Sequence, residues 1–315
     1  MQVGKIIQYY RKQRSMTQLE LAAGICTQGE ISMIEKDQRI PSFDLIGKLS
    51  TRLEIPIYYF QNQFFTHSRE VFLSDIFNQL EKAIHNRDYA NMTVHLKNKD
   101  VWKNCLDPND KQKFMCYKGI YINFYLHKPA EALKIYKKAL QETMSFSTND
   151  LSILAKRKTV FSKTETFLFS AAASSYFLLK KYSKAEELFD IACKNVDLIQ
   201  EKSSIETLGT IFYNASKNLK FMGKYEQAIE IAKKGLIFEQ ERHSIYRSSE
   251  LLFEIAESYY QLKNYELAQT NYIKSLSLAY SANDYHFFFL LIKALEKKDD
   301  LILLQQNIHI FKNMK

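Results

Sequence analysis

Glycine and proline are scarce in this chain, with 8 glycines and 4 prolines among 315 residues. The prolines are Pro41, Pro56, Pro108 and Pro129, and none follows residue 129. Sandwiches and barrels, which need many tight turns, are therefore disfavoured, and so are dinucleotide-binding α/β folds with glycine-rich loops. Because 46% of the residues are hydrophobic, the chain can still bury a large core. We expect an all-α protein.

Signatures of common enzyme classes are also missing. The sequence contains no GxxxxGK[ST], GxGxxG, HExxH or GxSxG motif. Its seven histidines and four cysteines show no spacing typical of a zinc site. We therefore predict a protein that is not an enzyme and that uses no cofactor and no metal.

Long apolar segments and a disulfide framework are absent as well. The longest apolar run covers residues 287–292, whereas a membrane span needs roughly 20 residues. The first residues lack the apolar stretch of a signal peptide, and the cysteines form no CxxC pair. We expect a cytoplasmic protein that enters no membrane; the sequence leaves open whether Cys26 has a redox role.

Charge is the first positive signal. The chain carries 44 Lys and Arg against 35 Asp and Glu, a net charge of +9. Such a balance suits an anionic partner without proving one.

The first sixty residues predict several short helices. An amphipathic helix covers residues 4–14. Thr17-Gln18-Leu19-Glu20 and Thr27-Gln28-Gly29-Glu30 are two capping boxes, in which a threonine accepts a backbone hydrogen bond and the glutamate reaches back. They begin the second helix and a third that ends near residue 36, and Pro41-Ser42 precedes a fourth over residues 43–53. Two short helices around a tight turn, within a five-helix unit, predict a helix-turn-helix.

This order of signals resembles the phage-repressor-like (XRE) DNA-binding domain over about residues 1–60. The resemblance implies an ion pair between Arg11 and Glu35, with a structural role. It leaves the outer side of the third helix to face DNA. Gln28 can make a bidentate contact to adenine, and Gln18 can bind a phosphate at the start of its helix. Many relatives have arginine where this chain has Met33, which changes the expected site preference. The expected DNA contacts are Gln18, Thr27, Gln28, Gly29, Ser32, Met33, Lys36 and Arg39.

An internal repeat organises the rest of the chain. Tyr182, Tyr225 and Tyr265 lie 43 and then 40 residues apart. Each is followed by alanine at the third position and by an aromatic or small residue at the seventh. Small residues let paired helices approach, and aromatic residues fill the gaps between pairs. The pattern resembles tetratricopeptide (TPR) repeats with a longer period, and predicts about five helix pairs over residues 71–278. A closing segment over residues 285–311 would cap the right-handed superhelix.

A TPR superhelix has a concave groove lined by the first helix of each pair, and such grooves commonly hold extended peptides. Asparagine can pair with both polar groups of a peptide bond, lysine can hold a carboxylate, and aromatic residues form pockets. The expected peptide contacts are Ser170, Ser174 and Phe177 in one repeat, Tyr213, Asn214 and Lys217 in the next, and Phe253, Glu257, Tyr260 and Gln261 in the third.

An XRE head followed by degenerate TPRs resembles the peptide-regulated transcription factors of Gram-positive bacteria, the Rap–Npr–PlcR–PrgX group. The resemblance covers the whole chain and includes the Ile55-Pro56-Ile57 junction. It implies that Asn214 contacts a signalling peptide, whereas the asparagine expected one repeat earlier is Ala171 here. It also implies a homodimer on palindromic double-stranded DNA. We expect a DNA-binding domain over residues 1–62, a linker helix or hinge over 63–70, and a peptide-binding and dimerisation domain over 71–315.

The function expected is a quorum-sensing transcription regulator, more readily an activator, whose affinity for DNA a short peptide controls. Two alternatives stay open. A protein or small molecule could control such a regulator instead, or the chain could act on phosphorelay proteins. The sequence does not indicate the operator, the regulon or the identity of the peptide.

Overall fold

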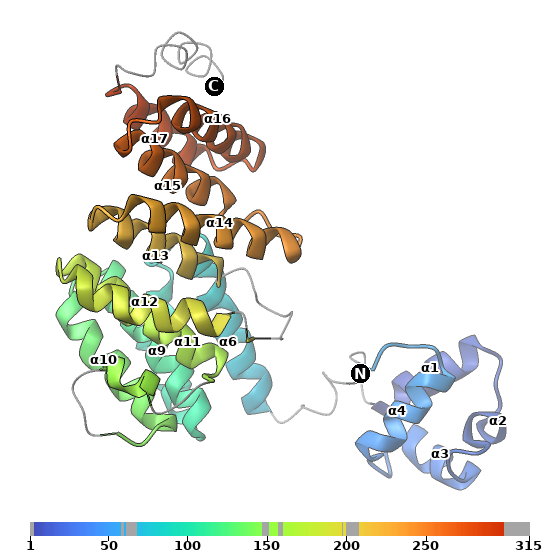
Figure 1. Cartoon of the computed structure of the whole chain (residues 1–315). Coiled ribbons are helices and arrows are strands. Elements are labelled where there is room, and N and C mark those ends of the chain that lie inside the picture. Colours follow the sequence, from blue (N-terminus) through green and yellow to red (C-terminus); the bar gives the residue numbers. More distant parts are fainter. Residues whose placement is uncertain are drawn as a thin grey trace. The chain divides into compact units, whose positions relative to one another are not determined.

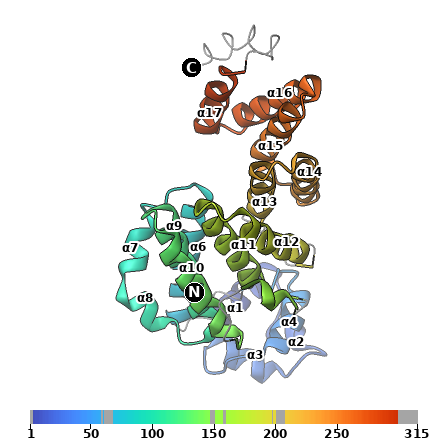
Figure 2. The ribbon, with the colours of Figure 1, turned by 60° about the vertical axis from the view of Figure 1, so that its left-hand side comes forward.

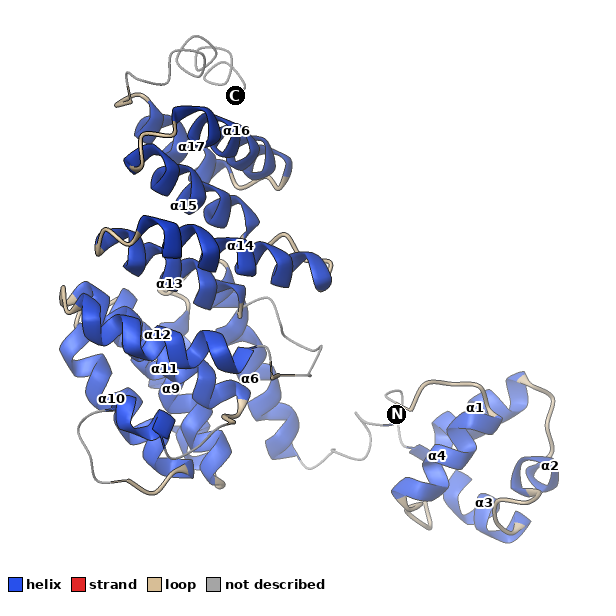
Figure 3. Ribbon diagram, in the orientation of Figure 1, coloured by secondary structure: helices blue, strands red, loops and turns tan. Residues whose placement is uncertain are grey.

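The computed structural model describes residues 3–57, 60, 68–146, 151–156, 160–196, 198–199 and 208–298. Every regular element within these ranges is helical, as Figure 3 shows. The chain divides into two compact units, Met1–Gln79 and Leu80–Lys315. Among the described helices, none combines the length and the apolar character that crossing a membrane requires.

The first unit begins with four short helices (Figure 1): α1 (Val3–Gln13), α2 (Gln18–Ala22), α3 (Gln28–Glu35) and α4 (Phe43–Arg52). Thr17, Thr27 and Ser42 each accept a hydrogen bond from the backbone N–H three residues later, which starts α2, α3 and α4 where the sequence predicts. The sequence predicts no bounds for the fifth helix of this unit. Phe60, after α4, is helical and buried.

The core of this unit is aliphatic. Ile7, Leu21, Ile31 and Leu49 are completely buried and belong to one cluster, to which Phe60 also contributes. Burying such a side chain contributes about 1.5–3 kcal/mol to the stability of the folded state. This cluster fixes α3 against α1, α2 and α4, and so determines which side of α3 remains exposed.

Helix α6 (Ser68–His85) follows. It runs without a break through residue 70, where the sequence analysis places the end of a linker. The helices after it, α7 (Met92–Lys97) and α8 (Lys99–Asn104), are short because the Asn98 side chain caps α8 directly after α7 ends. Residues 92–104 therefore form two short helices rather than one long helix.

Four full helix pairs then follow one another along the second unit (Figures 1 and 2), and a 3₁₀ helix, Leu151–Lys156, lies between the first two pairs. The pairs are α9 (Pro108–Phe124) with α10 (Pro129–Thr143), α11 (Lys163–Leu178) with α12 (Tyr182–Val196), α13 (Gly209–Phe221) with α14 (Tyr225–Glu241), and α15 (Ser248–Gln261) with α16 (Tyr265–Ser281).

Helix α17 (Tyr285–Leu295) closes the stack. Its Phe288 and Leu291 are buried against Tyr272 and Leu276 of α16 in one cluster. The capping segment expected over residues 285–311 thus forms a helix at its start, and residues 299–311 lie outside the described residues.

The repeated tyrosines mark the start of a helix. Tyr182, Tyr225, Tyr265 and Tyr285 are each the first residue of α12, α14, α16 and α17. Two positions earlier the backbone has a positive φ, at Lys180, Gly223, Lys263 and Asn283. This left-handed residue ends the preceding helix, and the next N–H bonds back to a carbonyl five residues earlier, as in Lys224 to Leu219 (3.0 Å).

Small residues allow close helix packing, as the repeat predicts. Ala185, Ala228 and Ala268 are completely buried. A Cβ atom added to Gly119 would lie 2.2 Å from the Tyr136 ring, and one added to Gly235 would lie 2.7 Å from Phe212 Cβ. These contacts set the spacing within and between the pairs, and with it the position of the faces that α11, α13 and α15 present.

Candidate nucleic-acid interface and ligand groove

A chain of side-chain hydrogen bonds joins the start of α3 to α1. Gln28 Nε2 donates to Gln18 Oε1 (2.9 Å), and Gln18 Nε2 donates to Glu35 Oε2 (2.9 Å). Arg11 donates to both oxygens of Glu35 (2.6 and 2.9 Å), so the expected ion pair is present. The network holds both glutamines in defined positions at the edge of α3 before any ligand binds.

Electrostatics support the charged form of Glu35. Burial alone would raise its pKa, but the hydrogen bonds from Arg11, Gln18 and Gln8 outweigh burial and hold that pKa below its usual value. The carboxylate therefore stays ionised at neutral pH and keeps its three donors.

The outer side of α3 presents the residues that the sequence analysis placed there. Gln28, Gly29, Met33 and Lys36 are exposed, and Ser32 is half-buried. A Cβ atom on Gly29 would meet no atom within 4 Å, so internal packing does not require this glycine. A residue without a side chain at this position leaves room for a ligand to approach the backbone of α3 closely. Gln28, Ser32 and Lys36 make this face largely polar, so that it can contact base edges and phosphates, and Met33 adds one apolar side chain.

The second capping box is only half formed. Thr27 accepts from the Glu30 N–H (3.1 Å), but the Glu30 carboxylate pairs with Arg39 (2.9 Å) and does not return to Thr27. Arg39, nine residues further on, competes for that carboxylate because the turn after α3 brings it close. Arg39, expected to contact phosphate, must leave Glu30 to do so.

Sequence reasoning missed some exposed apolar side chains of this unit. Ile40 is 84% exposed and Phe43 66% exposed, both around Pro41, and Leu19 on α2 is exposed as well. Ile40 lies in the short connection between α3 and α4, and the helical pattern does not place it in the core. Its position in the sequence was therefore the signal that could have predicted its exposure.

Two of the expected groove residues prove to be buried. Ser170 and Ser174 are 3% and 8% exposed, although the sequence analysis placed them on an exposed face. Helix α11 packs against α9, α10, α12 and α13, and its run of small residues lets all of them approach closely. The Ser174 hydroxyl donates to the Ser170 carbonyl (3.0 Å) and accepts a long hydrogen bond from Asn214 Nδ2 (3.4 Å).

Asn214 itself is half-buried on α13. Beside it, Tyr213 and Lys217 of α13 form a cation–aromatic cluster with Phe177 of α11. The Lys217 ammonium lies 5.5 Å from the centre of the Phe177 ring and 5.8 Å from that of Tyr213. Burial lowers the pKa of Lys217 and raises that of Tyr213. The structure therefore brings four expected residues together: Phe177, Tyr213, Asn214 and Lys217.

The expected residues of α15 already have partners inside the chain. Glu257 accepts from the Tyr272 hydroxyl (2.6 Å) and pairs with Lys298 (3.1 Å). The Lys298 ammonium also lies over the Tyr260 ring, 3.8 Å from its centre. Phe253 has the Lys220 ammonium over its ring at 5.5 Å, whereas Gln261 is exposed at the end of the helix.

A row of glutamates on α15 was not anticipated. Glu250, Glu254 and Glu257 recur at helical spacing, and each is paired with a cation from another element or turn. Lys220 pairs with Glu254 (2.7 Å), and both Arg87 (2.7 Å) and Arg247 pair with Glu250. Burial raises the pKa of Glu254 although Lys220 opposes it. The spacing of the glutamates was visible in the sequence. The pairing of Arg87 with Glu250 was not, because the two residues are 163 positions apart in the chain.

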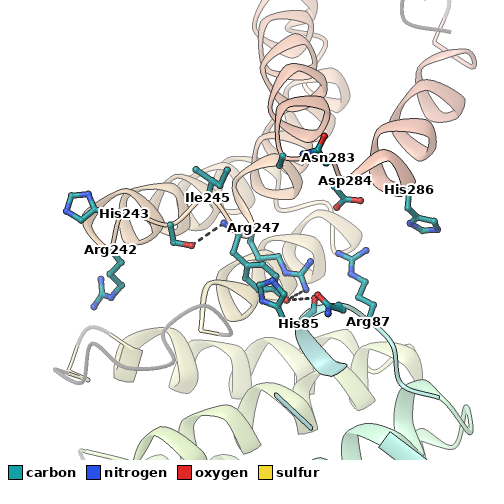
Figure 4. A pocket seen from close by; sticks show the side chains of 13 residues that line it. His85, Arg87, Arg242, His243, Ile245, Arg247, Asn283, Asp284 and His286 are labelled. Atoms are coloured by element: carbon teal, nitrogen blue, oxygen red, sulfur yellow. Dashed lines mark hydrogen bonds between the residues drawn. The ribbon is translucent and has the colours of Figure 1, made fainter. Parts of the chain in front are cut away.

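A cavity of about 1180 Å³ adjoins this row (Figure 4). His85 at the end of α6 and Arg87 in the turn after it line the cavity, together with His243 and Arg247 from the connection between α14 and α15 and His286 at the start of α17. His85 stacks on Tyr246 with ring centres 4.0 Å apart, and the Tyr246 hydroxyl donates to the His85 carbonyl (3.1 Å). Arg87, Arg242 and Arg247 line the cavity together with Asp284. Arginine guanidinium groups suit an anionic group.

Comparison with known proteins supports this architecture. A helix-turn-helix family model matches residues 7–60. No curated protein matches the chain. Among solved structures, PlcR of Bacillus thuringiensis in complex with the peptide PapR7 and DNA has a TM-score of 0.69 and 20% sequence identity, covering 91% of this chain and 98% of that chain.

Two streptococcal proteins are similar as well. ComR of S. thermophilus, in complex with DNA and its signalling peptide ComS, has a TM-score of 0.57 at 16% identity, over 91% of this chain and 96% of that one. The SHP pheromone receptor Rgg2 of Streptococcus dysgalactiae has a TM-score of 0.61 at 12% identity, over 94% of this chain and 99% of that one. The chain thus has their fold: a helix-turn-helix domain followed by a helical-repeat domain.

Proposed function

We propose that this chain is a sequence-specific DNA-binding transcription regulator, more readily an activator, whose DNA affinity a short signalling peptide controls. The observation that carries the proposal is the match over nearly the full length of both chains to PlcR solved with a peptide and DNA. A helix-turn-helix without the repeat domain would support only DNA binding, and the repeat domain alone would support only ligand binding.

The DNA-binding half rests on the polar face of α3. Gln28 and Gln18 are pre-positioned by the network that ends at Arg11 and Glu35. Preorganised side chains lose less conformational entropy on binding, so they favour recognition of one base pattern over others. We infer that Gln28 reads bases, while Gln18 and the cations around α3 contact phosphates.

The ligand-binding half rests on Asn214 and the cluster beside it. The Asn214 amide makes one long hydrogen bond to Ser174 within the described residues, at 3.4 Å. It retains capacity to pair with a peptide bond of an extended ligand. The resemblance leads one to expect a second asparagine where this chain has Ala171, and alanine cannot pair with a peptide bond. This difference implies a different peptide or weaker recognition of the peptide backbone.

Control of DNA binding requires that the peptide bind two arrangements of the repeat domain unequally. We propose a homodimer that presents two DNA-binding heads to a palindromic site, one or more helical turns apart. Peptide binding would stabilise the arrangement that matches the spacing of the half-sites. A coupling free energy of about 1–3 kcal/mol would change DNA affinity by roughly 5–150-fold.

Selection of a binding site tests the DNA-binding half. The purified full-length chain is incubated with a pool of random double-stranded oligonucleotides, and bound sequences are enriched and read. The proposal predicts a palindrome of two half-sites, together with a dimer mass in light scattering against a chain mass of 37.1 kDa. Enrichment of no common sequence would contradict it.

Recovery of bound peptides tests the ligand-binding half. The chain is incubated with the short-peptide fraction of a culture, separated by ultrafiltration and analysed by mass spectrometry. One enriched peptide sequence supports the proposal. A specific DNA site with no enriched peptide would favour control by a protein or a small molecule. Specific binding of a response-regulator protein without any DNA site would favour the phosphorelay alternative.

A further inference from the structure

A second groove lies on α7 to α10, away from the residues expected to contact DNA or peptide. It has a volume of about 800 Å³ and is bounded by the short helices α7 and α8 and by the helix pair α9 and α10. Figure 2 shows α7 and α8 beside α9 in this part of the second unit. The function proposed above uses none of its residues.

Trp102 of α8 stands at this groove, and it is the single tryptophan of the chain. Its side chain is 44% exposed and contacts Phe114, with ring centres 5.5 Å apart. The half-buried side chains of Leu96, Met115 and Ile135 continue this apolar floor. Exposed tryptophan beside aliphatic side chains is typical of the centre of a protein interface.

Lysines surround the floor. Lys97, Lys99, Lys103, Lys118 and Lys138 line the groove, and all five are exposed. Within the described part of the chain, Lys103 alone among them has an ion pair, a solvent-exposed contact with Asp100 at 3.3 Å. Among the described residues, Glu142 provides the one carboxylate that lines the groove with them. The rim therefore presents a concentrated positive charge without matching negative charge.

We propose that this lysine–tryptophan groove binds an acidic amphipathic segment of another protein. Apolar side chains of such a segment would cover Trp102 and the aliphatic floor, while its carboxylates would meet the lysine rim. The charge complementarity is direct, and helices with one apolar face commonly bind in grooves of this kind.

The composition of the groove favours a protein over nucleic acid. Arginine is the residue best suited to bidentate phosphate contacts, and the lining that the structure describes contains lysine but no arginine. Single-stranded nucleic acids stack successive bases on several aromatic rings, whereas here the floor beside Trp102 and Phe114 is aliphatic. Apolar floor and cationic rim together fit a partner with both apolar and acidic side chains.

Trp102 fluorescence provides a direct test on the full-length chain. The probe is a synthetic 16-residue peptide with leucine and phenylalanine on one helical face and glutamate on the other. We expect a saturable blue shift, because the peptide removes water from the indole ring, and an affinity that weakens as salt rises. A scrambled peptide of equal composition and a peptide with lysine in place of glutamate serve as comparison probes.

Charge reversal identifies the surface. The double variant Lys118→Glu, Lys138→Glu should bind the acidic probe at least about tenfold more weakly, because two favourable charge contacts become repulsive. The matched control Lys134→Glu changes an exposed lysine of α10 that does not line the groove, and it should bind normally. Circular dichroism verifies that all variants are folded.

The proposal is overturned by any of three results: an unchanged Trp102 spectrum, an equal response to the scrambled probe, or equal binding by both variants. A double-stranded or single-stranded oligonucleotide that binds here more tightly than the acidic probe would also overturn it in favour of nucleic acid. The test requires neither an operator nor a signalling peptide, so its outcome is independent of the function proposed above.

Discussion

Glu35 accepts hydrogen bonds from Gln8, Gln18 and Arg11 while its side chain is almost completely buried. A buried carboxylate with this many donors is both a stability element and the anchor of the glutamine pair at the edge of α3. At the residue scale, therefore, the network behind α3 determines two measurable properties.

The first property is acid sensitivity. The folded-state pKa of Glu35 lies below its ordinary value of 4.5, so its ionised form stabilises the fold above that pH. The contribution is lost as the pH falls through the range between the unfolded and folded pKa values. Glu35→Gln should destabilise the first unit by about 1–3 kcal/mol at pH 7 and weaken this pH dependence.

Hydrogen exchange of the α1 and α3 amides at pH 7 and pH 4 measures this loss in the full chain. Glu54→Gln is the control, because Glu54 makes a long and exposed ion pair with Arg14. Equal acid sensitivity of the wild type and of Glu35→Gln would show that the network does not stabilise the fold.

The second property is base specificity. Gln28→Ala removes the side chain that we infer reads bases, and it should cost about 1–3 kcal/mol on the selected site, or roughly 5–150-fold in affinity. Binding to random DNA should change little, because phosphate contacts dominate it. Gln13→Ala, an exposed residue at the end of α1, is the control. A variant that keeps full specificity would place base reading elsewhere.

At the scale of elements, close approach within helix pairs determines stability. Gly119→Ala places a methyl group 2.2 Å from the buried Tyr136 ring, so α9 and α10 must separate. We expect a loss of about 1–3 kcal/mol in the free energy of unfolding by urea. Gly47→Ala on α4 meets no atom within 4 Å and should be neutral or stabilising by up to about 1 kcal/mol. Equal effects of the two substitutions would contradict this packing.

The elements were predictable where the signal is local. Thr17, Thr27 and Ser42 start helices at the expected residues because an N-cap needs only its own neighbours. The tyrosine repeat located α12, α14 and α16 because each repeat buries the same small and aromatic positions. The break between α7 and α8 was missed, since the Asn98 cap has no repeat counterpart.

Contacts between distant segments were not predictable from one sequence. The burial of Ser170 and Ser174 depends on four helices that pack around α11. The pairing of Glu30 with Arg39 depends on how the chain turns after α3. Arg87 meets Glu250 only because the repeats bring the turn after α6 back to α15. The assignment of individual residues to DNA or peptide stays a prediction.

At the scale of the whole molecule, ligand recognition in the second unit should be separable from folding. Asn214→Ala removes an amide that makes one long internal hydrogen bond, so stability should change by less than about 1 kcal/mol. The affinity of this variant for the recovered peptide should weaken by roughly tenfold, which is equivalent to the loss of two hydrogen bonds. Asn109→Ala, at an exposed position of α9, is the control. An unchanged peptide response would show that Asn214 is not a ligand contact.

Peptide control requires that a peptide bound to the second unit change how tightly the first unit holds DNA. The most direct measurement is fluorescence anisotropy of the selected DNA site, titrated with the chain with and without the recovered peptide. Two salt concentrations are needed because phosphate contacts make affinity depend on salt. We predict that the peptide shifts the affinity for DNA by about 5–150-fold at both salt concentrations. Identical affinities with and without saturating peptide would contradict it.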